Sequence, residues 1–432
     1  MSPVLIGLLI LSAFAALWWL FLALTPSQRG LMRFVYRLID TPAKLNGGFP
    51  EDDVTQPYAG DETTFPLNKW PTVTVIVPGR NEGHILEKTL GSLCAMDYPN
   101  FRVIFVDDQS TDNTAEVCRK LQAQFPHLTV IHNKEAPRDG WIGKTWAVHQ
   151  AESYMNDNSV DYLLFTDSDL EFHPHCLRQM LRLAKHRNTD ITSLLPAMYC
   201  LTLGEILGLL SGMCIINSRL NLYACNNPKI PRALVAGGFL LVTRSTYHQL
   251  GGHAAVRGQV VEDVAFGTRA KALNKRVFTA LTHDLYKARM YEGWLDTFRG
   301  LKKNAYAGAN YNPLFGGVIA LFLLLMGVLP FSYAALGIAW AITAPTLLTL
   351  ATAATGIAAC LAQMLYAYQT ARFINFPRAA VLLTAPSFLF YQIIFLGSIF
   401  DYYVGGNTWA GRRVQKPQAL NTAGNVAPQS TP

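Results

Sequence analysis

The sequence contains few charged residues for its length. Asp, Glu, Lys and Arg make up 15% of its 432 residues, whereas 50% are hydrophobic, and the mean hydropathy is +0.18. A chain this apolar is not an ordinary soluble protein, and a chain with this many charges does not lie wholly in a membrane. The composition therefore predicts a mixed architecture, with a polar part and a membrane-embedded part.

Two further features are missing. The seven cysteines are scattered without the spacing of a metal site or a redox pair, which indicates reduced thiols that pack in a core. No nucleic-acid-binding motif is present, and the net charge of +7 is small and gathers at the edges of apolar runs. We therefore expect contact with anionic lipid headgroups and no nucleic acid partner.

Long apolar runs are present instead. The first, at 4–24, is uncharged and long enough to span a bilayer, and it lacks the basic start of a signal peptide. Three more follow near the other end of the sequence, at 314–336, 341–366 and 379–399. One predicted span thus precedes a large polar middle, and three follow it.

Basic residues at the edges of these runs predict a cytoplasmic polar middle in a multi-pass protein of the plasma or inner membrane. By the positive-inside rule, this orientation is favoured by Arg29, Arg33, Arg37, Lys302, Lys303, Arg372 and Arg378. The tail residues Arg412, Arg413 and Lys416 disagree, because four full crossings would place them outside. Either one segment is re-entrant or interfacial, or the tail is external.

Strand and helix patterns alternate in the polar middle. Apolar β-rich runs at 72–77, 102–106, 128–132 and 162–166 alternate with helical patterns at 85–93, 114–123 and 144–154. This alternation predicts a mostly parallel, Rossmann-like α/β sheet with helices on both faces. Open parallel sheets bind ligands beyond the carboxyl ends of their strands. Polar residues at those ends are therefore the first candidates for a site.

Polar clusters lie where three of these strands end. They are Arg80-Asn81-Glu82, Asp107-Asp108-Gln109-Ser110 and Asp167-Ser168-Asp169. Residues of these types also cap helices and form turns, so any single cluster has a purely structural explanation. Three such clusters at one rim of a sheet favour a ligand site.

Individual residues in and after these clusters suit a phosphorylated ligand and a metal. Asp167 and Asp169 bracket one residue after a buried strand, and their carboxylates suit Mg²⁺ or Mn²⁺ shared with a diphosphate. The carboxylate of Asp108 can accept hydrogen bonds from a base or a ribose. Lys144, at a predicted helix start, is either a phosphate ligand or an ordinary exposed lysine.

Two later motifs complete the candidate site. Gly237-Gly238 precedes an apolar run and leaves room for a ligand to approach the backbone. Glu262 and Asp263 are adjacent carboxylates among apolar residues, where an unpaired charge is expensive. They form either a salt-bridged structural pair or a general base that takes a proton from an acceptor hydroxyl.

Taken together, these motifs resemble the family-2 glycosyltransferases of the inverting GT-A type. The matching segments are 77–82, 106–112, 143–144, 166–169, 237–238 and 262–263, within about 72–309. The segments 140–144, 302–304 and 408–412 are similar to those of lipid-directed members. The nearest of these are the hopanoid-associated and the carotenoid (diaponeurosporenoate-type) glycosyltransferases, and ceramide glucosyltransferase is more distant.

The resemblance implies a nucleotide-sugar donor, a lipid acceptor, a divalent cation and a role for each matching residue. The nucleotide-sugar ligands would be Arg80, Glu82, Asp108, Lys144 and Asp167; the metal ligands Asp169 and Asp167; the base Asp263; and the supporting acceptor-side residues Gly237, Gly238 and Glu262. The Gln-x-x-Arg-Trp motif of processive synthases is absent, since the matching region contains Tyr291-Glu292-Gly293-Trp294 and then Arg299. This favours a single transfer and leaves open which residue faces the leaving diphosphate.

The implied organisation has five parts. They are an N-terminal transmembrane anchor with its basic flank (1–39), a linker (40–70), a GT-A catalytic domain (71–312), about three C-terminal transmembrane helices (313–402) and a polar, disordered tail (403–432).

The alternative functions are a polyprenyl-phosphate glycosyltransferase, which would not need Asp263 as a base in the same way, and a non-catalytic membrane subunit. A transporter is disfavoured, because the C-terminal spans are almost free of charge until Asp401.

One stretch within the predicted catalytic domain is open to two interpretations. Between 201 and 223, apolar residues recur at helical spacing, among them Leu203, Leu207 and Leu210. The pattern predicts either a core helix or an interfacial helix that guides a lipid toward Asp263.

Overall fold

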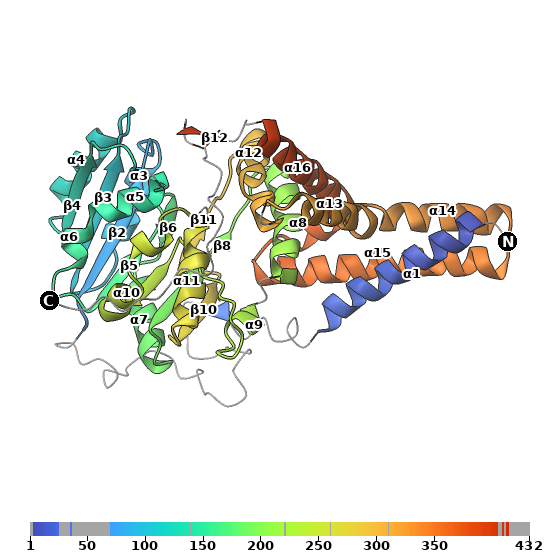
Figure 1. The fold of residues 1–432 in the computed structure, drawn as a ribbon, viewed down its shortest axis with the longest axis horizontal. Coiled ribbons are helices and arrows are strands. Elements are labelled where there is room, and N and C mark those ends of the chain that lie inside the picture. Colours follow the sequence, from blue (N-terminus) through green and yellow to red (C-terminus); the bar gives the residue numbers. More distant parts are fainter. Residues whose placement is uncertain are drawn as a thin grey trace.

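The computed structural model describes residues 3–25, 35–36, 70–138, 140–219, 222–259, 261–309, 311–404, 408–409 and 412–413. A sheet-containing half and a helical half lie end to end, and a long helical hairpin projects away from the sheet (Figure 1). Nearly all of the predicted linker, 40–70, and most of the predicted tail, 403–432, lie outside the described residues.

The main sheet has eight strands. In spatial order they are β1 (Val35–Tyr36), β10 (Val277–Thr282), β7 (Ile191–Leu195), β9 (Leu240–Thr243), β5 (Tyr162–Phe165), β2 (Val73–Gly79), β3 (Phe101–Asp108) and β4 (Leu128–Asn133). Neighbouring strands are parallel, except that β9 is antiparallel to both β5 and β7. The prediction of a mostly parallel α/β sheet is therefore confirmed.

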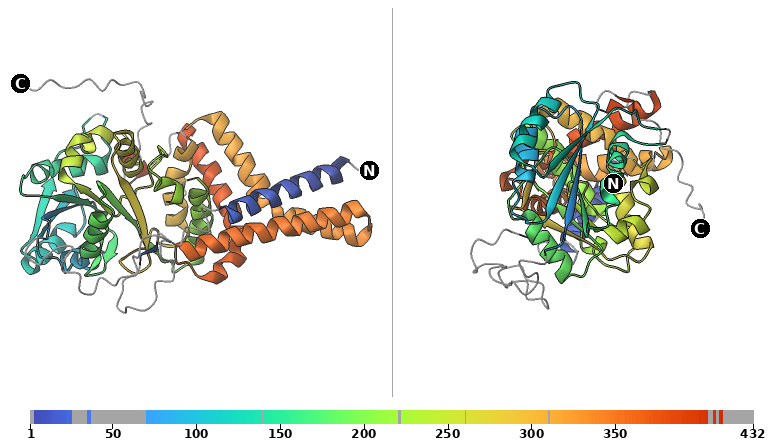
Figure 2. Two further views of the ribbon diagram at one scale, coloured as in Figure 1. Left: turned by 90° about the horizontal axis from the view of Figure 1, so that it is seen from below. Right: turned by 90° about the vertical axis from the view of Figure 1, so that its left-hand side faces the viewer.

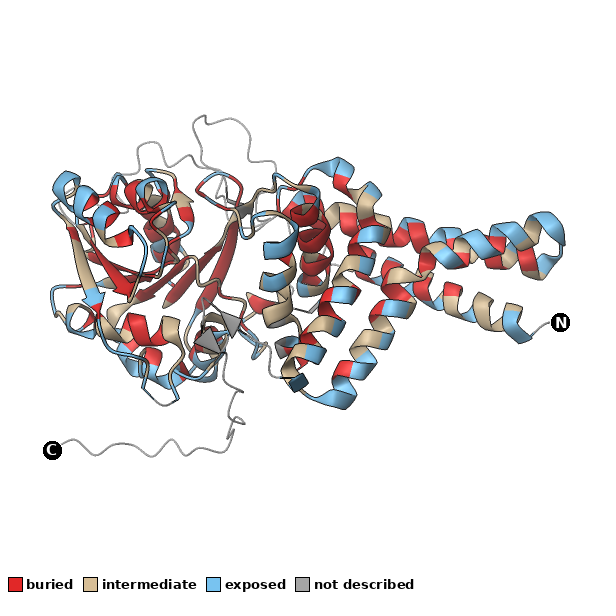
Figure 3. Ribbon diagram, turned by 90° about the horizontal axis from the view of Figure 1, so that it is seen from above, coloured by how far each residue is buried: buried red, intermediate tan, exposed pale blue. Residues whose placement is uncertain are grey.

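Helices cover both faces of this sheet (Figures 1 and 2). They include α3 (Leu86–Cys94), α4 (Thr114–Gln124), α5 (Gly143–Gln150), α6 (Glu152–Met155), α7 (Cys176–His186), α10 (Arg244–Gln249) and α11 (Glu262–Ala272). Alternate side chains of one strand enter different cores, so that Val75 packs in one hydrophobic cluster and Ile76 in the other. Burial on both faces explains why these strands are nearly continuous apolar runs (Figure 3). The single helix predicted at 144–154 is two helices, because the chain breaks at Ala151.

A second, three-stranded sheet lies beside the first. It comprises β6 (Leu170–Phe172), β11 (Tyr286–Ala288) and β8 (Ala197–Met198), with β11 in the middle. Because β6 starts directly after Asp169, this sheet fixes the chain on the far side of the acidic cluster. The segments after β8 and β11 lead into the helical half.

The helical half contains the predicted spans. Its elements are α1 (Pro3–Leu24), α13 (Pro313–Phe322), η5 (Leu323–Val328), α14 (Pro330–Thr343), α15 (Leu347–Phe373), η6 (Arg378–Leu383) and α16 (Thr384–Val404). In the part of the chain that the structure describes, three helical segments are long and apolar enough to cross a membrane: Pro3–Leu24, Leu347–Phe373 and Arg378–Val404. A fourth candidate is the pair Pro313–Val328 and Pro330–Thr343, which is bent by 48°.

One predicted boundary is wrong. The apolar run at 341–366 starts inside α14, and the helix that follows begins only at Leu347. Pro345 interrupts the backbone hydrogen bonding, and the Thr346 hydroxyl caps the new helix by accepting from the amide of Thr349. Hydropathy alone does not detect this break, because the turn residues are themselves apolar or small.

Polar groups hold the spans together. Trp19 Nε1 donates to the Met326 carbonyl at 2.7 Å, and Gln363 Nε2 donates to the Gly327 carbonyl at 2.8 Å. Both carbonyls belong to η5, a π-helical turn in which the regular backbone pattern is altered. Side chains from α1 and α15 therefore stabilise the bend between α13 and α14.

Helices α8 (Leu203–Arg219) and α12 (Gly293–Ala305) lie between the two halves (Figure 1). Leu207 and Leu210 of α8 are buried, and α8 packs against α12, α15 and α16. Its amide at Ser211 donates to Ser387 Oγ at 3.1 Å, and its Cys214 carbonyl accepts from the Tyr366 hydroxyl at 3.2 Å. Of the two interpretations of this stretch, the packing favours a core helix, but in the core of the helical half.

Candidate functional site

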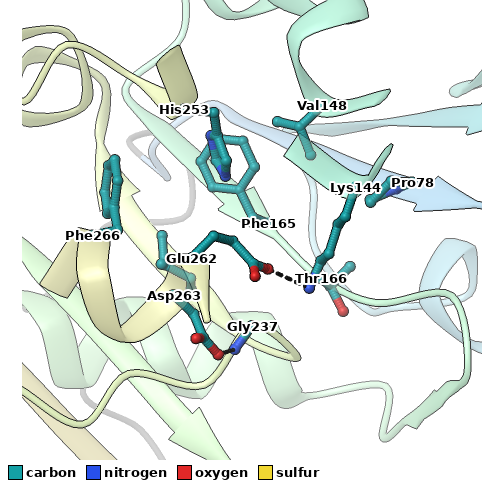
Figure 4. Close-up of a pocket in the computed structure, with 11 residues that line it drawn as sticks. Pro78, Lys144, Val148, Phe165, Thr166, Gly237, His253, Glu262, Asp263 and Phe266 are labelled. Carbon is teal, nitrogen blue, oxygen red and sulfur yellow. Dashed lines mark hydrogen bonds and ion pairs between the residues drawn. The ribbon is translucent and has the colours of Figure 1, made fainter. Parts of the chain in front are cut away.

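The predicted site residues lie along one rim of the main sheet. Arg80 and Glu82 follow β2, Asp108 ends β3, and Asp167 and Asp169 follow β5. Lys144 is in the first turn of α5, Glu262 and Asp263 begin α11, and Gly237-Gly238 precedes β9. The sheet and the helix starts thus bring segments that are widely separated in sequence to one place (Figure 4).

Lys144 is the centre of an ion-pair cluster. Its Nζ lies 2.5 Å from Asp167 Oδ1 and 2.8 Å from Glu262 Oε1. Burial lowers the pKa of Lys144, but the surrounding carboxylates of Asp167, Glu262 and Asp263 outweigh it and hold the pKa well above its ordinary value. The ammonium group is therefore positively charged at physiological pH, and this makes it suitable for binding phosphate.

Gly237 makes room for this cluster. A Cβ atom at this position would lie 2.8 Å from Lys144 Nζ and 3.3 Å from Asp263 Oδ2, so a side chain here would displace the Lys144 ammonium group. The amide of Gly237 donates to Asp263 Oδ2 at 2.7 Å, and the amide of Val264 donates to Asp263 Oδ1 at 2.7 Å. The backbone therefore fixes the orientation of the Asp263 carboxylate.

Asp263 ionises less readily than an ordinary aspartate. Burial and the neighbouring Glu262 carboxylate raise the pKa of Asp263 to about 7, although Lys144 and the two amides act in the opposite direction. A carboxylate with a pKa near physiological pH accepts a proton more readily than an ordinary aspartate.

Asp108, at the end of β3, and Arg80, in the loop after β2, form a second group. Asp108 is buried and accepts a hydrogen bond from Asn133 Nδ2 at 2.8 Å, and its carbonyl accepts from Arg80 Nη1 at 2.9 Å. The loops after β2 and β3 are joined by hydrogen bonds such as that from the Asn81 amide to Ser110 Oγ at 2.9 Å. These two loops form one preorganised wall of the rim.

The carboxylates near Asp169 fit a divalent cation. Desolvation by the surrounding protein, and then the charges of Asp167 and Glu82, raise the pKa of Asp169 to about 7 although the residue is exposed at the rim. Among the residues that the structure describes, no three His, Cys, Asp or Glu side chains form a complete ligand set. Such a site fits a cation that takes one or two carboxylates and completes its coordination with substrate phosphates.

Two residues that border this site, His253 and Asn133, belong to none of the predicted motifs. His253 lines the pocket with Lys144 and Glu262, and its ring lies between Phe165 and Phe266 (Figure 4). Burial, followed by the charge of Lys144, lowers the pKa of His253 to about 3, so its imidazole is neutral. The only sequence signal was the Gly251-Gly252 pair before it, where both glycines have positive φ. Asn133, the partner of Asp108, gave no signal.

The mostly parallel sheet and the helices on its faces have the arrangement of a GT-A type domain. Residues 74–206 match the family described as Glycosyl transferase family 2. This part of the chain is thus a family-2 glycosyltransferase domain, and the resemblance predicted from the motifs is confirmed.

Comparison with individual proteins agrees with this assignment. The chain is 26% identical over 242 residues to 4,4'-diaponeurosporenoate glycosyltransferase of Staphylococcus haemolyticus, covering 55% of this chain and 62% of the relative. It is 36% identical over 86 residues to β-monoglucosyldiacylglycerol synthase of Synechocystis sp., covering 19% of this chain and 17% of that protein. The matched regions therefore span less than two thirds of either relative.

A solved structure supports the fold over most of the chain. The mannosyltransferase PcManGT of Pyrobaculum calidifontis, determined with GDP-Man and Mn²⁺, aligns with a TM-score of 0.50 and 16% identity. The alignment covers 92% of this chain and 99% of that chain, so it includes the helical half as well as the sheet.

Proposed function

We propose that this protein is a membrane-bound, inverting glycosyltransferase that transfers one hexose from a nucleotide-diphosphate sugar to a lipid hydroxyl. The observation that carries the proposal is the Asp263 carboxylate, which has a raised pKa and is oriented by the Gly237 amide beside Lys144. A base and a phosphate-binding cation on one rim are the groups that such a transfer requires.

In the proposed reaction the donor lies along the rim of the sheet. Asp108, Arg80 and Glu82 bind the nucleoside, and Lys144 exchanges its carboxylate partners for the diphosphate. The acceptor hydroxyl gives its proton to Asp263 as its oxygen attacks the anomeric carbon from the side opposite the diphosphate. Asp169 and Asp167 would hold a Mg²⁺ or Mn²⁺ ion, which neutralises the charge that develops on the leaving diphosphate.

The helical half supports a lipid acceptor. Two relatives are named for diaponeurosporenoate and for glucosyldiacylglycerol, which are both lipids. Exposed apolar side chains continue from the face of α16 onto the start of α12, where Trp294 packs on Phe390 and, like Leu295, remains exposed. An acceptor that stays in the bilayer could reach the rim along this surface.

Lipid analysis tests this function. We expect that deleting the gene removes one glycosylated lipid from total lipid extracts, and that the wild-type gene restores it, whereas the Asp263→Asn variant does not. Mass spectrometry of the extracts measures this. Loss of a glycosylated polyprenyl phosphate would instead identify a phosphate acceptor, and an unchanged lipid profile with an altered soluble glycoside would contradict the lipid assignment.

The packing of α16 favours a C-terminus on the same side of the membrane as the catalytic half. The start of this segment follows α15, whose last residue, Phe373, accepts a hydrogen bond from His283 of the sheet-containing half at 2.9 Å. Near the other end of α16, Asp401 pairs with Lys302 of α12 at 2.6 Å. The chain that leads into α16 and the far end of α16 therefore both contact elements next to the sheet, which supports an α16 that does not cross the membrane fully.

Cysteine labelling tests this topology. The partly buried Cys200 is first replaced by serine, and one cysteine is then introduced at Ala344, Lys120 or Tyr403. In intact cells, the cysteine at Ala344 is expected to react with an impermeant maleimide, whereas the cysteines at Lys120 and Tyr403 are not. Permeabilised cells should label all three. Labelling of Tyr403→Cys in intact cells would show instead that α16 is a full span and that the tail is external.

A further inference from the structure

Helix α12 connects the catalytic rim to the membrane helices. Its start is fixed by Glu205 of α8, which is buried and accepts hydrogen bonds from the Gly293 amide at 2.8 Å and from Arg289 Nη2 at 2.9 Å. One face of α12 packs on α8, where Thr297 and Leu301 fill the space above Gly208. The helix is therefore held firmly on the side that faces the membrane helices.

The basic residues of α12 have three different environments. Arg299 is exposed, and Lys302 forms its ion pair with Asp401 of α16 at 2.6 Å. Lys303 is partly buried, and the charges that act on it are those of Glu262, Lys144 and Asp167. Since adjacent residues of a helix point about 100° apart, Lys302 faces the membrane helix while Lys303 faces the acidic cluster.

A neighbouring contact locates the same face of α12 at the rim. The ring of Tyr291 lies against Gly300, so closely that a Cβ atom there would overlap it, and Gly300 is one turn before Lys303. Tyr291 itself follows β11, whose Ala288 is paired with Leu170, the residue after Asp169. The face that carries Gly300 and Lys303 thus lies beside the end of β11 that adjoins Asp169.

We propose that Lys303 is a catalytic residue that binds the leaving diphosphate together with Lys144. This inference rests on the proposed transfer and assigns a cation to the position that the sequence left open. In that transfer the acceptor oxygen bonds to the anomeric carbon, the bond from this carbon to the β-phosphate oxygen breaks, and its electron pair stays on the diphosphate. The acceptor proton passes to Asp263, and Lys303 neutralises the added charge.

The surroundings of Lys303 agree with this role. Burial, with a smaller contribution from Lys144, lowers the pKa of Lys303 to about 8, and the carboxylates of Glu262 and Asp167 limit the decrease. Two cations beside the same carboxylates are favourable only when enough negative charge lies between them, and a diphosphate supplies more of it. Because α12 also pairs with α16 through Lys302, the position of Lys303 relative to α16 is fixed.

Nucleotide binding to the purified full chain in detergent tests the assignment. UDP, GDP, UMP and GMP are titrated in the presence of Mn²⁺, and the diphosphate that wild type binds is used. We expect Lys303→Met to weaken binding of the diphosphate by roughly tenfold or more, while binding of the monophosphate changes little. Lys303→Arg should retain much of the affinity for the diphosphate, because arginine keeps the positive charge.

Arg299→Met is the matched control, since Arg299 is an exposed cation one turn earlier on the same helix. It should leave both affinities unchanged. If Lys303→Met binds the diphosphate like wild type, or if Arg299→Met causes the loss, the assignment is wrong. Should Lys303→Met fail to fold, Lys303→Gln compared with Lys303→Arg decides the same question. Failure of wild type to bind either diphosphate would contradict the proposed function itself rather than this assignment.

Discussion

Asp263→Asn is expected to lower the rate of glycosyl transfer by roughly 100- to 10,000-fold, the usual contribution of a general base. The amide cannot accept the acceptor proton, but it retains the size of the carboxylate and an oxygen for the Gly237 amide. Binding of the nucleoside diphosphate should change much less, because Lys144 and Asp108 are retained. Single-turnover transfer and equilibrium nucleotide binding measure the two effects.

Asp161→Asn is the control for this substitution. Asp161 is an exposed residue that accepts a hydrogen bond from the Thr72 amide at 2.8 Å, on the far side of the strands from the rim. It should leave the transfer rate unchanged. An Asp263→Asn variant that transfers at the wild-type rate would show that another group accepts the proton.

The pH profile of the wild type provides a second measurement of the same base. The pKa of Asp263 is raised to about 7, so the carboxyl group is protonated and inactive below that pH and ionised above it. We therefore expect kcat/KM to fall at least roughly tenfold per pH unit below about 7, more steeply where Asp169 is protonated too, and to level off above it. A profile that stays flat down to pH 5 would contradict the raised pKa.

Asp169→Asn is expected to reduce transfer by roughly 1,000-fold, because a bound cation contributes several kcal/mol to stabilisation of the transition state. The substitution removes a charged ligand next to Asp167, so binding of Mn²⁺ in the presence of the nucleoside diphosphate should weaken as well. Isothermal titration with Mn²⁺ measures this directly. Full activity of the variant in saturating chelator would contradict the assignment of Asp169 as a metal ligand.

Glu171→Gln is the matched control for the metal site. Glu171 lies two residues after Asp169, on β6, and pairs with Lys88 at the surface at 2.8 Å. It should change neither activity nor Mn²⁺ binding.

Since the native surroundings raise the pKa of Asp169, its charge is unfavourable in the folded protein above pH 7. Asp169→Asn should therefore unfold at an equal or higher temperature than wild type, which separates a lost ligand from a lost fold.

The strands and the acidic clusters at their ends were predictable because they depend on local patterns. Apolar β-rich runs that end in Asp107-Asp108 and Asp167-Ser168-Asp169 place those carboxylates at one rim of any parallel sheet. Lys144 was predictable in the same way, because its position at the start of a helix follows from the local sequence pattern. These motifs were enough to predict the family, which the match of residues 74–206 to Glycosyl transferase family 2 bears out.

The contacts across this rim depended on the tertiary structure. The position of β9, antiparallel between β5 and β7, brings Gly237 against Lys144 and Asp263, and no local pattern predicts that pairing. His253 and Asn133 join the site only through packing, because neither belongs to a recognisable motif. The helix break at Pro345 could not be detected from hydropathy, because hydropathy measures composition and not the continuity of backbone hydrogen bonds.

Local composition and spacing were sufficient to predict the class of fold, the acidic and basic residues at the rim of the sheet and the presence of apolar helices. Only the tertiary structure decided that α8 and α12 belong with the membrane helices, and that Lys302 and Lys303 face different partners. The physical reason is that amphipathic helices carry no record in their own sequence of which apolar surface they will cover. That choice is made by the complementary side chains of α15 and α16.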